Sequence, residues 1–161
     1  MAGRRSIDPI ARLMQEHDIT LMHLSSLNRA TRSLAEQGYS EDAMLKVREA
    51  VQFLSLEVGE HNTHEEEALF PVLERYVEGP TRMMRAEHKE LKRELRKLQT
   101  AIRAIHSARV SIKTLRGVRV RAQTLIQRFV NHIHKENNIL FPLVQKFLTR
   151  DALREIARRL V

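Results

Sequence analysis

Apolar residues recur every three or four positions through most of this 161-residue chain, which is the spacing of amphipathic α-helices. The pattern predicts a first helix from about Asp8 to Gln37, because Asp8 is a suitable N-cap and Gly38 a suitable stop. His17 lies within the apolar stripe of this helix. The other members of the stripe are Ile10, Leu13, Met14, Leu21, Leu24 and Leu27.

Two more helices are predicted from the residues that begin and end them. Ser40 is expected to cap a second helix that continues to about Val77, before the helix-breaking pair Gly79-Pro80. Thr81 is expected to cap the third helix. The inward face of the third helix is predicted to consist of Met84, His88, Leu91, Leu95, Leu98, Ile102 and Ile105.

A turn over residues 106–111 is expected to lead into a fourth helix over residues 112–148, and a short helix over residues 150–160 follows, with Thr149 or Asp151 near its start. Short connections between long helices favour antiparallel neighbours. The predicted fold class is therefore all-α. It is an up-down-up-down four-helix bundle with a short extra C-terminal helix, in a single domain spanning residues 1–161.

A repeat with an offset of 71 residues divides the chain into two helical hairpins, about 8–78 and 80–148. His61, Glu65 and the segment Leu69-Phe70-Pro71 reappear in the second hairpin as His132, Glu136 and Leu140-Phe141-Pro142. The same offset relates Glu16-His17 to Glu87-His88. Each hairpin thus has one His on its first helix and a His-x-x-x-Glu motif on its second. The prolines are expected to bend the second and fourth helices.

Composition narrows the range of functions. The chain has no Cys, which excludes disulfides, thiolate-bound metal clusters and thiol catalysis. No apolar run is long enough to span a membrane, and no apolar stretch follows the basic start, Met1–Ser6, as a signal peptide would require. A cytoplasmic location with no membrane partner is expected.

The net charge of +8 is unevenly distributed. Residues 1–80 have 8 basic and 14 acidic residues, whereas residues 81–161 have 20 basic and 6 acidic residues. Such a bias is typical of an anion or nucleic-acid partner, but also of two hairpins that attract each other or of a solvated face, and the latter interpretations are favoured here. The candidate contact patch is Arg103, Arg109, Lys113, Arg116, Arg119 and Arg121.

Both His-x-x-x-Glu motifs lie on stripes that are otherwise apolar, because residues four apart share one face of a helix. A buried carboxylate is costly unless it is paired or bound to a cation. Imidazole combined with carboxylate suits iron or manganese. The two stripes are Leu54, Val58, His61, Glu65, Ala68, Leu69 and Val72, and Leu125, Phe129, His132, Glu136, Ile139, Leu140 and Leu143.

We therefore predict a centre with two metal ions. His17 and His61 would bind one ion, and His88 and His132 the other. Glu65 and Glu136 would each bridge the two ions, together with a hydroxide or oxide. One coordination position on each ion would remain open for dioxygen, nitric oxide or peroxide. The predicted apolar surroundings include Leu13, Leu21, Met84, Leu91, Phe129 and Ile139.

The other histidines and acidic residues near these motifs are expected to have no direct role in metal binding. Glu16 and Glu87 are expected to be solvated, and Glu66 and Glu67 to lie at the surface or, at most, to contact a ligand. The histidines expected to be structural or exposed are His23, His64, His106 and His134.

These motifs resemble those of the hemerythrin-like cation-binding (HHE) domain over about residues 8–148. The resemblance implies a four-helix bundle around a non-haem di-iron centre, with the six residues named above as iron ligands. Oxygen-carrying hemerythrins have a fifth His where this chain has Lys92. Four His with two bridging Glu is similar instead to the repair-of-iron-centres proteins.

The expected function is binding of a small ligand for sensing, storage or stress defence. The alternatives are a di-iron oxidoreductase (a peroxidase, ferroxidase, nitric-oxide reductase or iron-centre repair protein) and a basic helical module that binds nucleic acid or an acidic partner.

Overall fold

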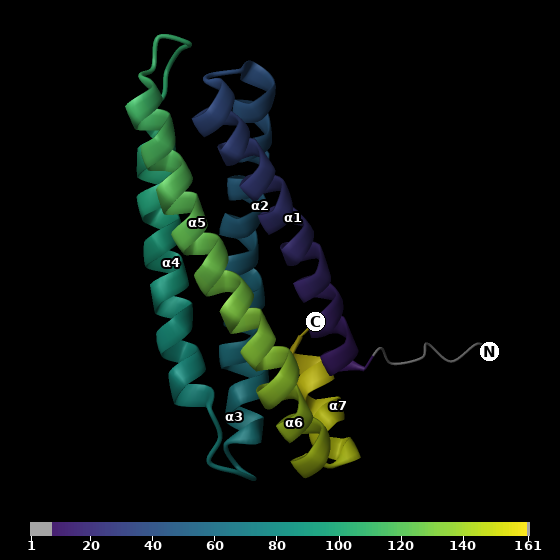
Figure 1. Cartoon of the computed structure of the whole chain (residues 1–161). Helices are drawn as coiled ribbons and strands as arrows, with labels where there is room; N and C mark the ends of the chain where they lie inside the picture. Colours follow the sequence, from purple (N-terminus) through teal and green to yellow (C-terminus); the bar gives the residue numbers. More distant parts are fainter. Residues whose placement is uncertain (1–7, 161) are drawn as a thin grey trace, which may run out of the picture.

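The computed structural model describes residues 8–160 and confirms the predicted all-α bundle (Figure 1). Its four long helices are α1 (Pro9–Gln37), α2 (Glu41–His64), α4 (Thr81–Arg103) and α5 (Ile112–Lys135). Helix α1 packs against α2 and α5, and α4 packs against the same two helices. The basic start, Met1–Ser6, lies outside the described residues. No described helix combines the length and the apolar character needed to cross a membrane.

Most helix starts follow the local rules that predicted them. The side chains of Asp8 and Ser40 accept hydrogen bonds from backbone N–H groups of the first turn, at 3.0 and 3.1 Å. Thr149 does the same for α7 (Arg150–Arg159) at 3.1 Å. The prediction that Thr81 is an N-cap was wrong: Pro80 occupies that position without a capping side chain, and Thr81 is the buried first residue of α4.

The second and fourth predicted helices each contain a π-helical turn directly after the glutamate of the repeated motif. These turns are η1 (Glu65–Leu69) and η2 (Glu136–Leu140), followed by α3 (Phe70–Leu73) and α6 (Phe141–Phe147). The N–H of Phe70 bonds to the carbonyl of Glu65, five residues back, and Phe141 bonds to Glu136 in the same way. The proline that follows has no N–H, and an α-helix would bring its ring against the carbonyl four residues back. The wider π-helical turn accommodates each proline without ending the helix.

After η2, the buried face differs from the predicted one. Continuing the α-helical spacing from Glu136 predicts that Ile139 and Leu143 face inward. Instead, Ile139 is 47% exposed and Leu143 half-buried, whereas Phe141 and Val144 are buried. Met14, predicted on the stripe of the first helix, is also exposed, at 39%.

The buried apolar residues form two separate clusters along the bundle. The upper cluster joins α1, α2, α4 and α5 through residues such as Leu27, Leu54 and Leu98. The lower cluster includes Leu13 and Phe70 and is covered by α7. Arg75, which follows α3, forms an ion pair with Glu155 of α7: its guanidinium donates to both carboxylate oxygens, at 2.9 and 3.0 Å. Other α7 residues in this cluster are Ala152, Ile156 and Leu160.

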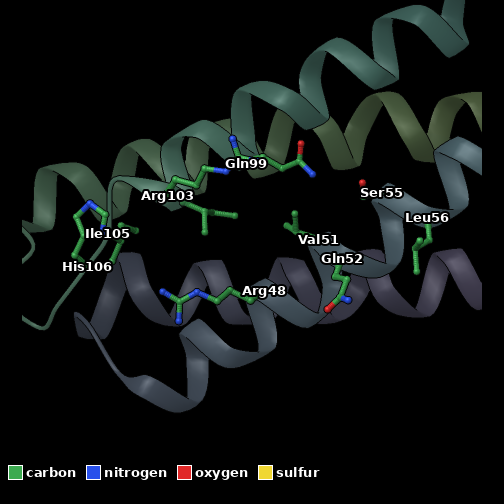
Figure 2. A pocket seen from close by; sticks show the side chains of 10 residues that line it. Arg48, Val51, Gln52, Ser55, Leu56, Gln99, Arg103, Ile105 and His106 are labelled. Carbon is green, nitrogen blue, oxygen red and sulfur yellow. The ribbon is translucent and has the colours of Figure 1, made fainter.

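A surface cleft of about 480 Å³ lies between α2 and α4, at the end of the bundle that holds the α1–α2 and α4–α5 connections (Figure 2). Arg48 and Arg103 lie at this cleft together with His106, above the buried side chains of Val51 and Ile105. None of the six predicted metal ligands lines it. This cleft is therefore distinct from the predicted centre.

Candidate metal centre

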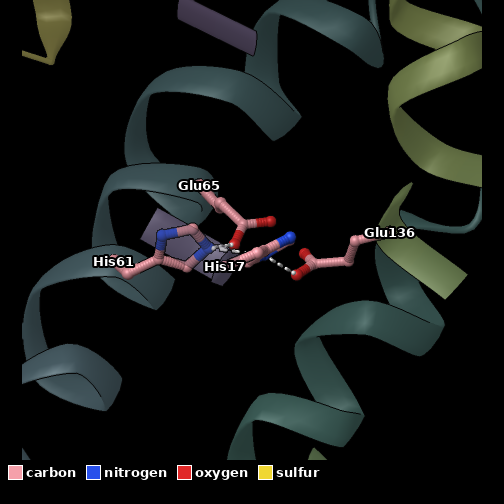
Figure 3. Close-up of side chains that lie close together, drawn as sticks. All are labelled: His17, His61, Glu65 and Glu136. Carbon is pink, nitrogen blue, oxygen red and sulfur yellow. Dashed lines mark hydrogen bonds and ion pairs between the residues drawn. The ribbon is translucent and has the colours of Figure 1, made fainter. Parts of the chain in front are cut away.

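The six predicted ligands come together in a polar layer between the two apolar clusters. They come from all four helices of the predicted bundle, and each side chain is at most 5% exposed. Four of them point toward one another in Figure 3. On its own helix, each ligand lies one or two turns from a member of each apolar cluster. Burial of these apolar residues therefore places the ligands in the layer between the two clusters. The six candidate ligands are His17, His61, Glu65, His88, His132 and Glu136.

The donor atoms fall into two groups that share Glu136. In the first group, Nε2 of His17 lies 3.0 Å from Nε2 of His61 and 3.0 Å from Oε1 of Glu136. Glu65 completes this group, with Oε1 2.5 Å from Nε2 of His61. In the second group, Glu136 lies 3.1 Å from Nε2 of His132 and 3.9 Å from Nε2 of His88. Within each group the ligand atoms lie within 4.8 Å of one another.

The outer nitrogen of every candidate His is held by an acceptor. Nδ1 of His61 lies 2.7 Å from Glu16, and Nδ1 of His132 lies 3.1 Å from Glu87. Ionised carboxylates only accept hydrogen bonds, so Nδ1 carries a proton and Nε2 is the nitrogen that is left to bind a metal ion. The prediction that Glu16 and Glu87 are solvated was wrong.

The remaining two histidines are oriented by residues that the repeat offset also relates. Nδ1 of His88 lies 3.0 Å from Glu66, and Nδ1 of His17 lies 2.7 Å from Oδ1 of Asn137. Glu66 thus contacts a candidate ligand, one of the two roles predicted for it. Asn137 was not anticipated, although it stands 71 residues after Glu66 and the repeat could have identified it.

Two phenylalanines of the repeated Leu-Phe-Pro segments support the same rings. Phe141 stacks on His17 with the ring centroids 5.4 Å apart, and Phe70 stacks on His88 at 5.9 Å. Each phenylalanine therefore contacts the first-helix His of the other hairpin. The sequence showed these residues only as members of the repeated segments.

Most of the inward-facing donor atoms lack hydrogen-bond partners; Nε2 of His17 and Nε2 of His61 pair with each other. Both oxygens of Glu65, both oxygens of Glu136 and Nε2 of His88 and His132 are buried without one. These are six of the eight such side-chain atoms in the described part of the chain. Lone pairs that face one another repel unless a proton or a cation lies between them. The donor set of imidazole and carboxylate, without thiolate, suits iron or manganese.

The electrostatics of the layer point the same way. Burial raises the pKa of Glu65 well above its usual 4.5, and the charge of Glu136 raises it further. Burial would also raise the pKa of Glu136, but its close polar contacts with Glu65 and with His132, His17 and His88 hold that pKa well below 4.5. The two directions differ because the closely spaced carboxylates cannot both ionise without a cation, and Glu136 lies close to three imidazoles.

Two of the histidines bind a proton more tightly than a free imidazole does. Burial would lower the pKa of His61, but the charge of Glu65, the hydrogen bond that His61 donates to Glu16 and the close contact with Glu65 raise it well above 6.5. The pKa of His132 is raised for the same kind of reason, because Glu136 and Glu87 outweigh burial. A metal ion entering this layer would therefore displace protons.

The histidines predicted to have no metal role lie outside both groups of donor atoms. His23 stacks on Phe53, with centroids 3.7 Å apart, and His106 and His134 are exposed. Lys92, at the place of the fifth hemerythrin His, is also exposed, and Leu91 is the buried residue on that turn. The buried apolar neighbours of the layer include Leu13, Met84 and Phe129, whereas Leu21 is only half-buried.

The fold and this layer define a class of protein: a helical bundle with a buried imidazole–carboxylate centre suited to iron. The family model of the hemerythrin HHE cation binding domain matches residues 8–144. The chain therefore belongs to the hemerythrin HHE cation-binding domain family, as its motifs predicted.

Similarity to individual proteins is lower and partial. The iron-sulfur cluster repair proteins YtfE of Yersinia pseudotuberculosis serotype IB (strain PB1/+) and Yersinia pestis (strain Pestoides F) are each 30% identical to this chain over 90 residues. The matched segment covers 53% of this chain and 41% of each relative. The chain thus spans less than half the length of these relatives.

Proposed function

We propose that this protein holds two non-haem iron ions in the polar layer and binds a small ligand there. His17 and His61 would hold one iron, and His88 and His132 the other. Glu65 and Glu136 would bridge the pair, with a hydroxide or oxide between the ions. The observation that supports this assignment is the convergence of six buried donor atoms without hydrogen-bond partners.

The chain's own residues would orient the ligands and keep water out. The four acceptors on Nδ1 fix the tautomer and the ring orientation of the histidines, which strengthens Nε2 as a ligand. Buried apolar side chains, among them Leu13, Met84 and Leu91, surround the layer and favour small, weakly polar molecules over bulk water. The iron pair would supply affinity for dioxygen, nitric oxide or peroxide, for sensing, storage or stress defence.

Metal analysis of the protein purified from iron-rich medium tests this proposal. We expect two irons per chain and near-ultraviolet absorption that changes on addition of azide or nitric oxide. Glu65→Ala or Glu136→Ala should leave at most one iron, whereas Glu67→Ala, on the exposed side of the same π-helical turn, should retain both. Two irons in either of the first two variants would show that the assignment of bridging ligands is wrong.

Iron–sulfur cluster repair is the second candidate function, and the similarity to the YtfE proteins favours it. Repair would require iron to leave the layer and reach a damaged cluster. Incubating the iron-loaded protein with an enzyme whose iron–sulfur cluster has been damaged by nitric oxide tests this directly. Recovery of that enzyme's activity, with loss of iron from wild type, would favour repair over ligand binding alone.

A further inference from the structure

The surface formed by α5 and the second half of α4 is strongly basic. Residues 91–133 contain eleven lysines and arginines and one acidic residue, Glu94. This segment therefore has an excess of ten positive charges, more than the net charge of +8 of the whole chain. Helices α4 and α5 pack against each other and lie side by side in Figure 1, so this excess of charge belongs to two neighbouring helices.

Few of these cations are neutralised. Lys97 lies 3.3 Å from Glu94, and Arg128 lies 2.9 Å from Glu90. The other eight exposed cations have no carboxylate within 4.0 Å in the part of the chain that the structure describes. They are Lys92, Arg93, Arg96, Arg103, Arg109, Lys113, Arg116 and Arg121.

Arg119 differs from the other cations of this segment because its side chain links α5 to α1. Its guanidinium donates to the carbonyl and to the side-chain oxygen of Asn28 in α1, both at 2.7 Å, and to Thr31 at 3.1 Å. The prediction that Arg119 belongs to an exposed contact patch was therefore wrong.

The surface between α4 and α5 is hollowed where the cations gather. Two adjoining hollows of about 530 and 520 Å³ share Lys97 and Arg121 in their linings. Small side chains between the cations leave the surfaces of the two helices open to a partner. We call this surface the α4–α5 groove; its lining residues are Arg93, Glu94, Arg96, Lys97, Thr100, Ala101, Ala104, Gly117, Val120, Arg121 and Thr124.

We propose that the α4–α5 groove binds the phosphodiester backbone of a nucleic acid. Three of the four cations that line the groove are arginines, whose planar guanidinium groups bind phosphate oxygens through paired hydrogen bonds. Phe129 is the single Phe, Trp or Tyr among residues 91–133, and it is buried, so no such ring of this segment is available to stack on bases. The binding is therefore to the backbone, independent of base sequence and weakened by salt.

The lining of the groove favours a nucleic acid over an anionic membrane. A helix that lies on a membrane inserts large apolar residues beside its cations. Val120 is the one large exposed apolar residue among the lining residues of the groove. The groove is also independent of the iron assignment, because Arg96 follows His88 by eight residues, about 12 Å along the helix.

Fluorescence anisotropy with a labelled duplex DNA of arbitrary sequence tests the proposal on the full chain over a series of salt concentrations. We expect the affinity to fall as salt rises, with a slope of log K against log salt of about −3 to −4 for the four cations that line the groove. The double variant Arg96→Glu/Arg121→Glu should weaken binding roughly tenfold or more at moderate salt, and should reduce the slope by about two.

The matched control is Arg150→Glu/Arg158→Glu, which makes the same change in net charge on exposed positions of α7. It should bind DNA within about twofold of wild type if the groove is the binding site. Circular dichroism confirms that each variant is folded. An equal loss of affinity in both double variants would overturn the proposal, as would tighter binding of anionic phospholipid vesicles or of an oligo-glutamate peptide than of DNA at the same salt concentration.

Discussion

Replacing Glu65 with Gln should make the metal-free protein more stable while removing its capacity for a second metal ion. The Glu65 side chain is fully buried, and neither of its oxygens has a hydrogen-bond partner. Burial and the neighbouring charge of Glu136 raise the pKa of Glu65 well above 4.5. The folded, metal-free protein therefore contains a buried carboxyl group, Glu65, that no hydrogen bond stabilises. Gln has the same shape without the charge, and its amide can donate to Nε2 of His61, which lies 2.5 Å from Oε1 of Glu65.

The size of the effect follows from the unsatisfied group. A buried polar group without a partner costs about 1–3 kcal/mol, so we expect metal-free Glu65→Gln to be more stable than wild type by about 2 kcal/mol. For a chain of this length that corresponds to a rise in Tm of roughly 4–8 °C. Metal should have the opposite effect: an ion present at about a thousand times its Kd stabilises wild type by about 4 kcal/mol, and the variant should lose much of that gain.

Thermal unfolding followed by circular dichroism, with and without Mn²⁺ or anaerobic Fe²⁺, measures both effects. Glu67→Gln is the matched control, because Glu67 lies on the same π-helical turn but is exposed. A metal-free Glu65→Gln protein that melts below wild type would refute the reasoning, and so would an equal rise in Tm with metal for the two proteins.

The pH dependence of the difference is a further check. Because the folded pKa of Glu65 is raised, wild type is favoured below the unfolded pKa of 4.5 and loses this contribution as pH rises through the folded pKa. Gln does not titrate. The advantage of Glu65→Gln should therefore be smallest below pH 4.5 and grow toward neutral pH; a constant difference would contradict the assigned burial cost.

Three other expectations follow from the same structure. Glu16→Gln should weaken metal binding by roughly 10–100-fold in a competition titration with a chelator, whereas Glu60→Gln, at an exposed position of α2, should not, because Glu16 orients His61. Ile156→Ala should lower the free energy of unfolding by about 2–5 kcal/mol in urea denaturation, since this α7 side chain is fully buried against the lower apolar cluster. Metal binding should release protons and weaken as pH falls, because the neighbouring carboxylates raise the pKa of His61 and His132 in spite of burial; calorimetry in two buffers of different ionisation enthalpy would show no difference if this is wrong.

Helical spacing and the repeat were sufficient to predict the bundle and to bring the six candidate ligands together. Each ligand lies on an apolar stripe, and burying those stripes against one another leaves the polar members facing inward. The spacing failed after Glu136, where it placed Ile139 inward. A π-helical turn follows Glu136, and Phe141 and Val144 are buried there in place of Ile139 and Leu143. After the equivalent turn at Glu65, Ala68 and Val72 remain buried, and α7 packs on that side of the bundle. A period of 3.6 residues cannot anticipate such an insertion.

The acceptors on the outer side of the histidines were harder to predict for a different reason. Glu16 immediately precedes His17 in sequence, yet its partner is His61 on the neighbouring helix, at 2.7 Å. Contacts between helices depend on how the rods are rotated and staggered, which the periodicity of one helix does not determine. The repeat offset held the missing information, since Glu87 makes the equivalent contact with His132.

Comparison of the two halves of the repeat shows which features of the polar layer are the same in both and which differ. The six candidate ligands, both phenylalanines and both prolines are identical in the two halves, whereas Glu66 in one half corresponds to Asn137 in the other. Both of these residues place an oxygen on the Nδ1 of a candidate His, at 3.0 and 2.7 Å, but only one carries a charge. The property common to both halves is therefore an acceptor that fixes the tautomer and direction of the ring. Both ends of the centre therefore share an acceptor that orients the imidazole, but they do not share an added negative charge.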